Sequence, residues 1–184
     1  MARVYYSATS AGRNTTTSTT YQNQVSLTFT PNASKKYLIL WGCLLDNDST
    51  TNDSRARLYH DTAAAARQTF NFEAKDATDN YQCAGAYIYE APGSPSCQSF
   101  RVQYSSESTN TTGCQDGYLI ALELDAADLY AVQTAEQTNG SSTFASVTTD
   151  LSLAAGDWLL LFSGEIQNTG LCEWRIRDKT NSVT

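Results

Sequence analysis

The sequence predicts an all-β protein: an antiparallel β-sandwich of the jelly-roll kind, followed by a second, partial copy of the same unit. Three observations lead to this prediction. Apolar and polar residues alternate along many short segments, as they do in strands that bury one face. These segments recur at intervals of roughly ten to fifteen residues with polar turns between them, a spacing typical of sandwiches and jelly rolls. The same order of segments then restarts after Asp125.

The first unit is organised around residues 35–47, KKYLILWGCLLDN, with turn-forming residues on both sides. A short apolar run of this kind could be a buried strand or a buried helix segment. Its length and its β-branched, aromatic and aliphatic composition favour a strand. We therefore expect Tyr37 and Trp41 in the core. A similar run, GDWLLLFSGEIQN, occupies residues 156–168 and places Trp158 in an equivalent position.

Alternation predicts the other strands of the first unit. They are residues 4–6, 25–29, 55–60, 69–74, 83–89, 100–104 and 117–124. The Ser- and Thr-rich segment 9–20 is predicted as an exposed loop or arm that becomes ordered only upon contact with a partner. Residues 63–67 are rich in alanine, which favours helix, but so short a helix is marginal, so a single helical turn and a loop are both open. Residues 92–95, PGSP, form the clearest turn.

The second copy is predicted from segments that repeat in the same order. Leu129–Val132 matches Val4–Ser7, Ser142–Phe144 matches Thr19–Tyr21, Trp158–Phe162 matches Tyr37–Trp41, Asn168 matches Asn47, and Arg175–Arg177 matches Arg57–Tyr59. The offset shrinks from 125 (129 minus 4) to 118 (175 minus 57), as loop deletions would produce. Chance similarity between two β-rich segments is the alternative.

The repeat divides the chain into a β-sandwich domain, residues 1–126, and the start of a second, incomplete sandwich, residues 127–184. Half a sandwich cannot cover its own apolar face or protect its sheet edges. We therefore expect that the natural polypeptide continues or that another chain completes the second sandwich.

The overall charge and hydropathy argue against several classes of partner. The formal net charge is −7 and the sequence pI about 4.6, whereas nucleic acids and anionic membrane surfaces attract basic proteins. No apolar run approaches the roughly 18 residues of a membrane span, and the N-terminus lacks the apolar core of a signal peptide. We expect a soluble protein made in a cytoplasm, with no nucleic-acid or membrane partner.

The five cysteines do not form a recognisable framework. They are Cys43, Cys83, Cys97, Cys114 and Cys172. Their number is odd and no two are spaced as CxxC, so neither a zinc site nor a full set of disulfides is indicated. Free, partly buried thiols are the favoured interpretation. A single bridge between Cys83 and Cys97 around the PGSP turn remains open, because sequence does not report its geometry.

The sequence gives little support to an enzyme. His60 stands beside Asp61, but no GxSxG elbow supplies a serine nucleophile, so we expect a surface or interface histidine. Carboxylate pairs for glycoside hydrolysis could be drawn from several acidic residues, but an acidic chain offers such pairs by chance. Those residues are Glu73, Asp76, Asp79, Glu90, Glu123 and Glu165. The acidic loop 46–53 could hold Ca²⁺, but it lacks the pattern of an EF-hand, and a solvated loop is favoured. We expect no catalytic residue, no metal and no cofactor.

Taken together, the segments YLILWG (37–42), RARLYHD (55–61), FNFEAKDATD (70–79), AGAYIYEAPGSP (84–95), FRVQYSSES (100–108) and GYLIALELD (117–125) resemble β-sandwich domains of tailed-bacteriophage structural proteins. Such domains are found in capsid decoration (cement) proteins and in head or tail fibres. The resemblance implies a non-enzymatic virion protein that forms oligomers, with a trimer favoured. It also implies the major capsid protein, or another virion protein, as the partner.

In this interpretation the sandwich docks on a shell or fibre through its rim and terminal segments. The expected interface residues are Tyr5, Tyr6, Thr15, Thr16, Thr17 and Tyr21. The alternative function is a carbohydrate-binding sandwich of a tail fibre or host-recognition protein, because sugars stack on exposed aromatic rings. The tyrosines open to that role are Tyr21, Tyr59, Tyr81, Tyr87 and Tyr89.

Overall fold

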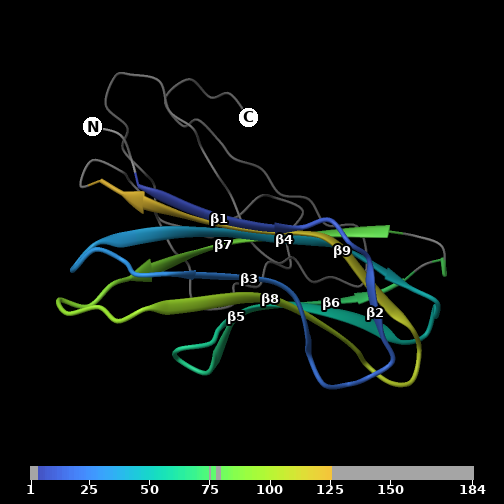
Figure 1. Ribbon diagram of the computed structural model, residues 1–184. Helices are drawn as coiled ribbons and strands as arrows, with labels where there is room; N and C mark the ends of the chain where they lie inside the picture. The colour runs from blue at the N-terminus through green and yellow to red at the C-terminus, as the bar shows by residue number, and fades with distance from the viewer. Residues whose placement is uncertain (1–3, 75, 78–79, 126–184) are drawn as a thin grey trace, which may run out of the picture. The chain divides into compact units, whose positions relative to one another are not determined.

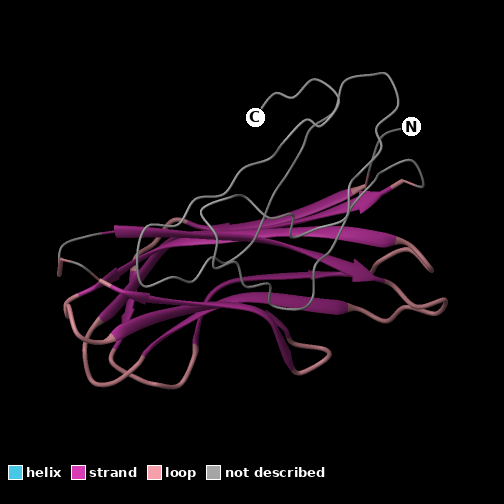
Figure 2. Cartoon of the chain, turned by 180° about the vertical axis from the view of Figure 1, so that it is seen from behind, coloured by secondary structure: helices cyan, strands magenta, loops and turns pink. Residues whose placement is uncertain are grey.

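The computed structural model describes residues 4–74, 76–77 and 80–125, which form two antiparallel β-sheets packed face to face (Figure 1). No helix occurs among these residues (Figure 2), so the predicted all-β sandwich is confirmed. The strands are β1 Tyr5–Ser10, β2 Asn14–Thr16, β3 Gln22–Phe29, β4 Lys36–Asn47, β5 Asp53–His60, β6 Ala65–Glu73, β7 Asn80–Glu90, β8 Gln98–Ser106 and β9 Thr112–Leu124.

By its internal contacts the chain divides into two compact units, Met1–Leu124 and Asp125–Thr184. The predicted second copy, with Trp158 and Cys172, lies outside the described residues. Within the described ranges, no helix is long and apolar enough to cross a membrane.

Sheet A has the strand order β1-β9-β4-β7, with β2 also paired to β9, and sheet B has the order β3-β8-β5-β6. From β2 onward, every connection except the β5–β6 hairpin crosses from one sheet to the other. Neighbouring strands are therefore mostly distant in sequence. This is the interleaved topology expected of a jelly roll rather than of a simple meander.

Strand β4 lies between β9 and β7 and confirms the prediction for residues 35–47. Alternate residues from Tyr37 to Leu45 face sheet B and are buried, Tyr37 and Trp41 completely. The Trp41 indole N–H donates to the Gln68 side-chain oxygen at 2.6 Å, which satisfies its polar atom. A β-carbon at Gly85 would collide with both groups, so a glycine at this position on β7 leaves room for the indole and its partner.

Sheet B contributes the alternating apolar residues of β3, β5 and β8 to the same core, as their patterns predicted. Phe29 links the two layers. The centre of its ring lies 4.7 Å from the ring centre of Tyr6, 5.3 Å from that of Tyr37 and 6.2 Å from that of Phe100. A single core therefore joins strands from both sheets, and ring contacts of Phe29 connect them.

One open alternative and one expectation about local structure are wrong. Residues 63–67 form no helical turn: Asp61 and Ala64 close a tight turn, and β6 already begins at Ala65, opposite His60. Pairing along β5 supplies backbone hydrogen bonds that an isolated alanine turn cannot match. Nor is the segment 9–20 simply an exposed arm. Its residues Asn14–Thr16 pair with β9, which is long enough to hold both β1 and β2 along one edge.

Candidate functional site

Two of the expected interface residues, Tyr5 and Tyr6, are neighbours on β1 but face different surroundings. Tyr5 is 68% exposed, and the adjacent Val4 is 39% exposed. Among the described residues these are the exposed large hydrophobic side chains. Tyr6 instead stacks on Phe29 and directs its hydroxyl to the Thr30 carbonyl at 3.4 Å. The strand alternation therefore leaves Tyr5 as the accessible anchor and makes Tyr6 part of the rim of the core.

The three threonines lie on or next to β2. Thr15 and Thr17 are exposed, while Thr16 is half-buried and its hydroxyl accepts the Ser18 backbone N–H at 3.1 Å. A shallow, open and polar depression lies beside them, lined in part by Arg13 and Tyr104. The threonines thus present hydroxyl groups rather than apolar contact area.

Tyr21 belongs to a row of side chains on the outer face of sheet B. The guanidinium carbon of Arg57 lies 3.6 Å from the centre of the Tyr21 ring and 4.5 Å from that of Tyr59. Arg57 Nε donates to the Gln103 side-chain oxygen, and Gln103 Nε2 donates to Asn23 Oδ1, both at 2.8 Å. We call these five residues the Arg57 row. The row offers two tyrosine rings, a cation and the Asn23 amide at the surface, while Gln103 is buried and holds the Arg57 guanidinium.

Nothing in the sequence marks Arg57 and Gln103 together as members of this surface. Alternation in RARLYHD does place Arg57 on the polar face of its strand. Gln103, however, is opposite Arg57 only because β5 pairs with β8 in that register. This pairing could have been predicted only with the strand order already known.

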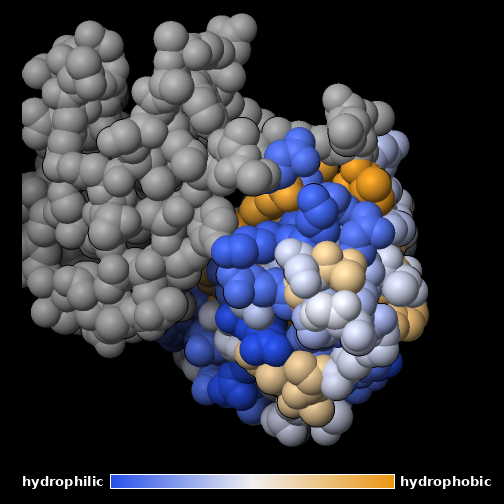
Figure 3. Space-filling view, turned by 90° about the vertical axis from the view of Figure 1, so that its left-hand side faces the viewer, coloured by the Kyte–Doolittle hydropathy of each residue, from blue (hydrophilic) through white to orange (hydrophobic). Residues whose placement is uncertain are grey.

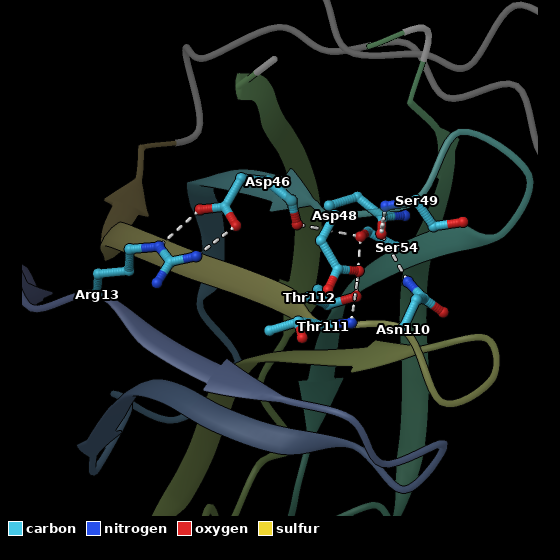
Figure 4. Close-up of polar contacts among 9 residues, drawn as sticks. Arg13, Asp46, Asp48, Ser49, Ser54, Asn110, Thr111 and Thr112 are labelled. Carbon is cyan, nitrogen blue, oxygen red and sulfur yellow. Dashed lines mark hydrogen bonds and ion pairs between the residues drawn. The ribbon is translucent and has the colours of Figure 1, made fainter. Parts of the chain in front are cut away.

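A second polar network holds the loop between β4 and β5, at one end of the sandwich (Figure 4). Asn47 is its centre and is only 2% exposed. Its Nδ2 donates to the Asn52 carbonyl at 2.5 Å, and its Oδ1 accepts from the Ser49 backbone at 3.0 Å and from Asn110 Nδ2 at 2.6 Å. Because Asn110 belongs to the β8–β9 connection, Asn47 joins two loops.

Further contacts fasten the same end, and we call the whole network the loop clamp. Asp48 Oδ1 accepts the Thr111 backbone N–H at 2.7 Å, and the Ser54 and Thr112 hydroxyls lie 2.9 Å apart in the interior (Figure 4). Asp46 forms a two-pronged ion pair with Arg13 at 2.8 and 2.7 Å. The loop 46–53 is therefore not simply solvated, since its base is buried and hydrogen-bonded.

The loop clamp also bears on the alternative of a Ca²⁺ site. The carboxylates of Asp46 and Asp48 are used by Arg13 and by the Thr111 backbone. In the part of the chain that the structure describes, no group of three or more His, Cys, Asp or Glu side chains is placed to hold a metal ion. The contacts of the clamp hold the two loops together, which is a structural role.

His60 is buried, not at the surface as expected. It is 3% exposed and stacks on Phe100 with ring centres 4.3 Å apart. Its Nε2 lies 2.8 Å from the Gln98 side-chain oxygen and its Nδ1 lies 3.2 Å from Arg67 Nη2. Burial lowers the pKa of His60, which favours a neutral ring that donates to Gln98 and accepts from Arg67. These contacts satisfy both nitrogens, so the histidine can be held in the core.

The four described cysteines are free thiols. The open alternative of a Cys83–Cys97 bridge is wrong: Cys83 is buried in the core, whereas Cys97 is exposed. The PGSP turn is held instead by backbone contacts, among them Ser34 N–H to the Pro92 carbonyl at 3.1 Å and Ala91 N–H to the Lys35 carbonyl at 2.8 Å.

The fold and these surfaces define a β-sandwich module with two candidate contact surfaces, the Val4–Tyr5 end of β1 and the Arg57 row. No protein-family model and no curated protein matches the chain. Its neighbours among solved structures include the VP2 subviral particle of infectious bursal disease virus, with 9% identity, a TM-score of 0.46 and coverage of 65% of this chain and 32% of that one.

Carbohydrate-binding modules are also among the neighbours. A family 16 module covers 57% of this chain and 73% of its own at 11% identity and a TM-score of 0.32, and a CBM4 structure covers 65% and 94% at 11% identity and a TM-score of 0.33. The chain spans about a third of the length of the viral chains it matches. At these identities and TM-scores, the likeness says nothing of what this chain binds.

Proposed function

We propose that this chain is a non-enzymatic structural protein of a virion. It decorates or stabilises the capsid of a tailed phage, or forms part of a head fibre, through contacts between subunits. The observation that supports the proposal is the exposed pair of Val4 and Tyr5 at the start of β1. Beyond β1, sheet A has no further strand among those described, so an apolar anchor lies beside a strand edge. A neighbouring subunit can add a strand there and enclose the aromatic ring.

The described body of the protein is suited to act as a rigid spacer. One core joins both sheets, and the loop clamp closes the end at which the β4–β5 and β8–β9 loops meet. On the face shown in Figure 3 the described residues are mainly hydrophilic, and strongly apolar residues occupy only a small area. Contact through a few anchors in a polar surround fits a surface of this kind.

In this proposal the partners are the major capsid protein or another virion protein, and further copies of the chain, with a trimer favoured. Residues 127–184 supply the start of a second sandwich of the same kind. The protein acts in the virion after synthesis in the host cytoplasm.

The test compares the full chain with Tyr5→Ala by sedimentation equilibrium and by cosedimentation with phage particles. We expect the wild type to form oligomers or to bind particles, and Tyr5→Ala to weaken the association about tenfold or more, as removal of a central aromatic anchor does. Tyr59→Ala is the matched control, because it removes a tyrosine from the other sheet. A wild-type protein that stays monomeric and binds no particle would refute the proposal.

A second candidate function, carbohydrate binding, is favoured by the Arg57 row. Sugar rings present C–H faces to aromatic rings and hydroxyl groups to arginine and amide side chains, all of which the row supplies on one surface. In a titration with soluble oligosaccharides, this function predicts saturable quenching of tyrosine fluorescence that Arg57→Ala abolishes. Quenching that persists in Arg57→Ala would exclude the row as the binding site.

A further inference from the structure

Three thiols meet inside the sandwich, on the core side of sheet A. Cys43 lies on β4, Cys83 on β7 and Cys114 on β9, and all three are buried. Because β4 runs between the other two strands, Cys43 has a thiol neighbour on each side. The thiols of Cys114 and Cys83 both form hydrogen bonds with the sulfur of Cys43. All three side chains belong to the hydrophobic core, and the proposed function makes no use of their thiol chemistry.

The register distinguishes the two neighbours of Cys43. Cys43 and Cys83 are directly opposite each other in the antiparallel β4–β7 pair. Residues opposite each other in such a pair have Cα atoms about 4.5 to 5.5 Å apart, within the range of about 4.4 to 6.8 Å that a disulfide spans. Cys114 is opposite Leu45, beyond an irregularity between Gly42 and Leu44, and so lies diagonal to Cys43. The geometry therefore favours Cys83 as the partner of Cys43.

The hydrogen bonds also make the three thiols chemically unequal. Hydrogen bonds from Cys114 and Cys83 lower the pKa of Cys43, against the opposing effect of burial, because they stabilise the thiolate. The pKa values of Cys83 and Cys114 are raised, because each uses its proton in that hydrogen bond and because both are buried. Since the thiolate is the nucleophile, Cys43 is the thiol that reacts first.

We propose that Cys43 and Cys83 are an oxidation site, which a peroxide converts into a disulfide that joins β4 to β7 inside the core. The Cys43 thiolate attacks one oxygen of hydrogen peroxide, the O–O bond breaks, and Cys43 becomes a sulfenic acid while hydroxide leaves and takes up a proton. The Cys83 sulfur then attacks the Cys43 sulfur, the S–O bond breaks, and water leaves with the Cys83 proton. In sum, two thiols and one peroxide give one disulfide and two waters.

The bond would restrain the unfolded chain more than the folded one. It closes a loop of 40 residues (83 minus 43) between strands that already lie side by side. Cross-linking of this length reduces the entropy of the unfolded state. We expect the thermal midpoint of the purified protein to rise by roughly 10 °C on oxidation. Because both thiols are buried, the reaction proceeds as local opening of the sheet admits the peroxide.

The experiment treats the purified full chain with hydrogen peroxide, blocks remaining thiols under denaturing conditions, and maps linked peptides by mass spectrometry. The expected product is a Cys43–Cys83 linked peptide, with a higher thermal midpoint that dithiothreitol reverses. Cys97→Ser is the matched control, since it removes an exposed thiol and should leave both results unchanged. The readout involves no partner or particle, so it is independent of the proposed function.

Two variants keep the test decisive if one of them folds poorly. Cys83→Ala should prevent the rise in thermal midpoint and leave Cys43 as a sulfenic acid that dimedone labels, or as a higher oxide. Cys114→Ser should still give the Cys43–Cys83 bond. A Cys43–Cys114 bond in the wild type, a link only through Cys97, or no linked peptide at all would overturn the proposal.

Discussion

The loop clamp and the Arg57 row are both polar networks built from amides, hydroxyls and charged groups, but they differ in their access to water. In the loop clamp, Asn47, Ser54 and Thr112 are buried and their polar groups are satisfied within the chain. In the Arg57 row, the rings of Tyr21 and Tyr59 and the Arg57 guanidinium remain partly exposed. Burial raises the cost of an unpaired polar group, whereas water can replace a lost partner at the surface. The clamp is therefore a structural element, whereas the rings and the guanidinium of the row are available for contact, with only Gln103 buried beside them.

The largest expected effect tests the buried network. Asn47→Ala removes three part-buried hydrogen bonds, which the Asn52 carbonyl, the Ser49 backbone N–H and the Asn110 side-chain amide then lose. We expect the free energy of unfolding to fall by about 2 to 3 kcal/mol in urea titrations. If the loss were below about 0.5 kcal/mol, the network would not be the joint that we describe. Asn23→Ala, an exposed asparagine of the Arg57 row, is the matched control.

A smaller decrease in the free energy of unfolding is expected at acidic pH, because His60 is buried. Its pKa in the folded state lies below the usual value near 6.5, so the unfolded chain binds the proton more readily. The free energy of unfolding should therefore fall as the pH drops below about 6.5, until the folded-state pKa is passed. Burial is the main cause of the lowered pKa. The charge of Arg67 lowers it further, whereas the hydrogen bond with Gln98 and the charge of Asp61 raise it. Urea titrations between pH 7 and 5 should show this slope in the wild type and a flatter one in His60→Gln.

The contact between the Ser54 and Thr112 hydroxyls can be tested for energetic coupling between the two side chains. Ser54→Ala or Thr112→Val alone leaves the other buried hydroxyl with one partner fewer, and each should cost about 1 kcal/mol. The double variant should cost clearly less than the sum of the two, since no unpaired hydroxyl remains at that contact. A double-mutant cycle from urea titrations measures the difference, and strict additivity would contradict the direct contact.

The smallest effect on stability is expected in the Arg57 row. Arg57→Ala removes a half-exposed side chain with one hydrogen bond and two ring contacts, so the unfolding free energy should change by only about 0.5 to 1 kcal/mol. Arg57→Lys keeps the charge but loses the planar stacking. A loss comparable to that of Asn47→Ala would show that the row is structural, as the clamp is, and would argue against its use in binding.

Much of the sandwich could be predicted from particular residues. The alternation of Val25, Leu27 and Phe29, and the composition of residues 35–47, identified strands and the faces that they bury. This information is local, because in a strand successive side chains point to opposite faces whatever the strand pairs with. The same locality explains why β2 was missed, since its three residues carry no alternating apolar pattern and are held by β9.

The candidate surfaces were less accessible to prediction. Alternation places Tyr5 and Tyr6 on opposite faces of β1, but only the packing of Phe29 against Tyr6 shows which face is the buried one. His60 looked like a surface residue, because its partners Gln98 and Phe100 are about forty residues away (98 minus 60 is 38). The composition could not predict that both nitrogens of the His60 ring would have hydrogen-bond partners, Gln98 and Arg67, inside the protein.

Local patterns in the sequence were enough to predict the strands, the apolar residues that they bury, and the core positions of Tyr37 and Trp41. Which strands meet depends on the tertiary fold. That choice placed Cys43 opposite Cys83, Gln103 beside Arg57, and Asn110 against Asn47. The physical reason is that side-chain alternation is fixed by the local backbone, whereas register and strand order depend on contacts between segments that are distant in the chain.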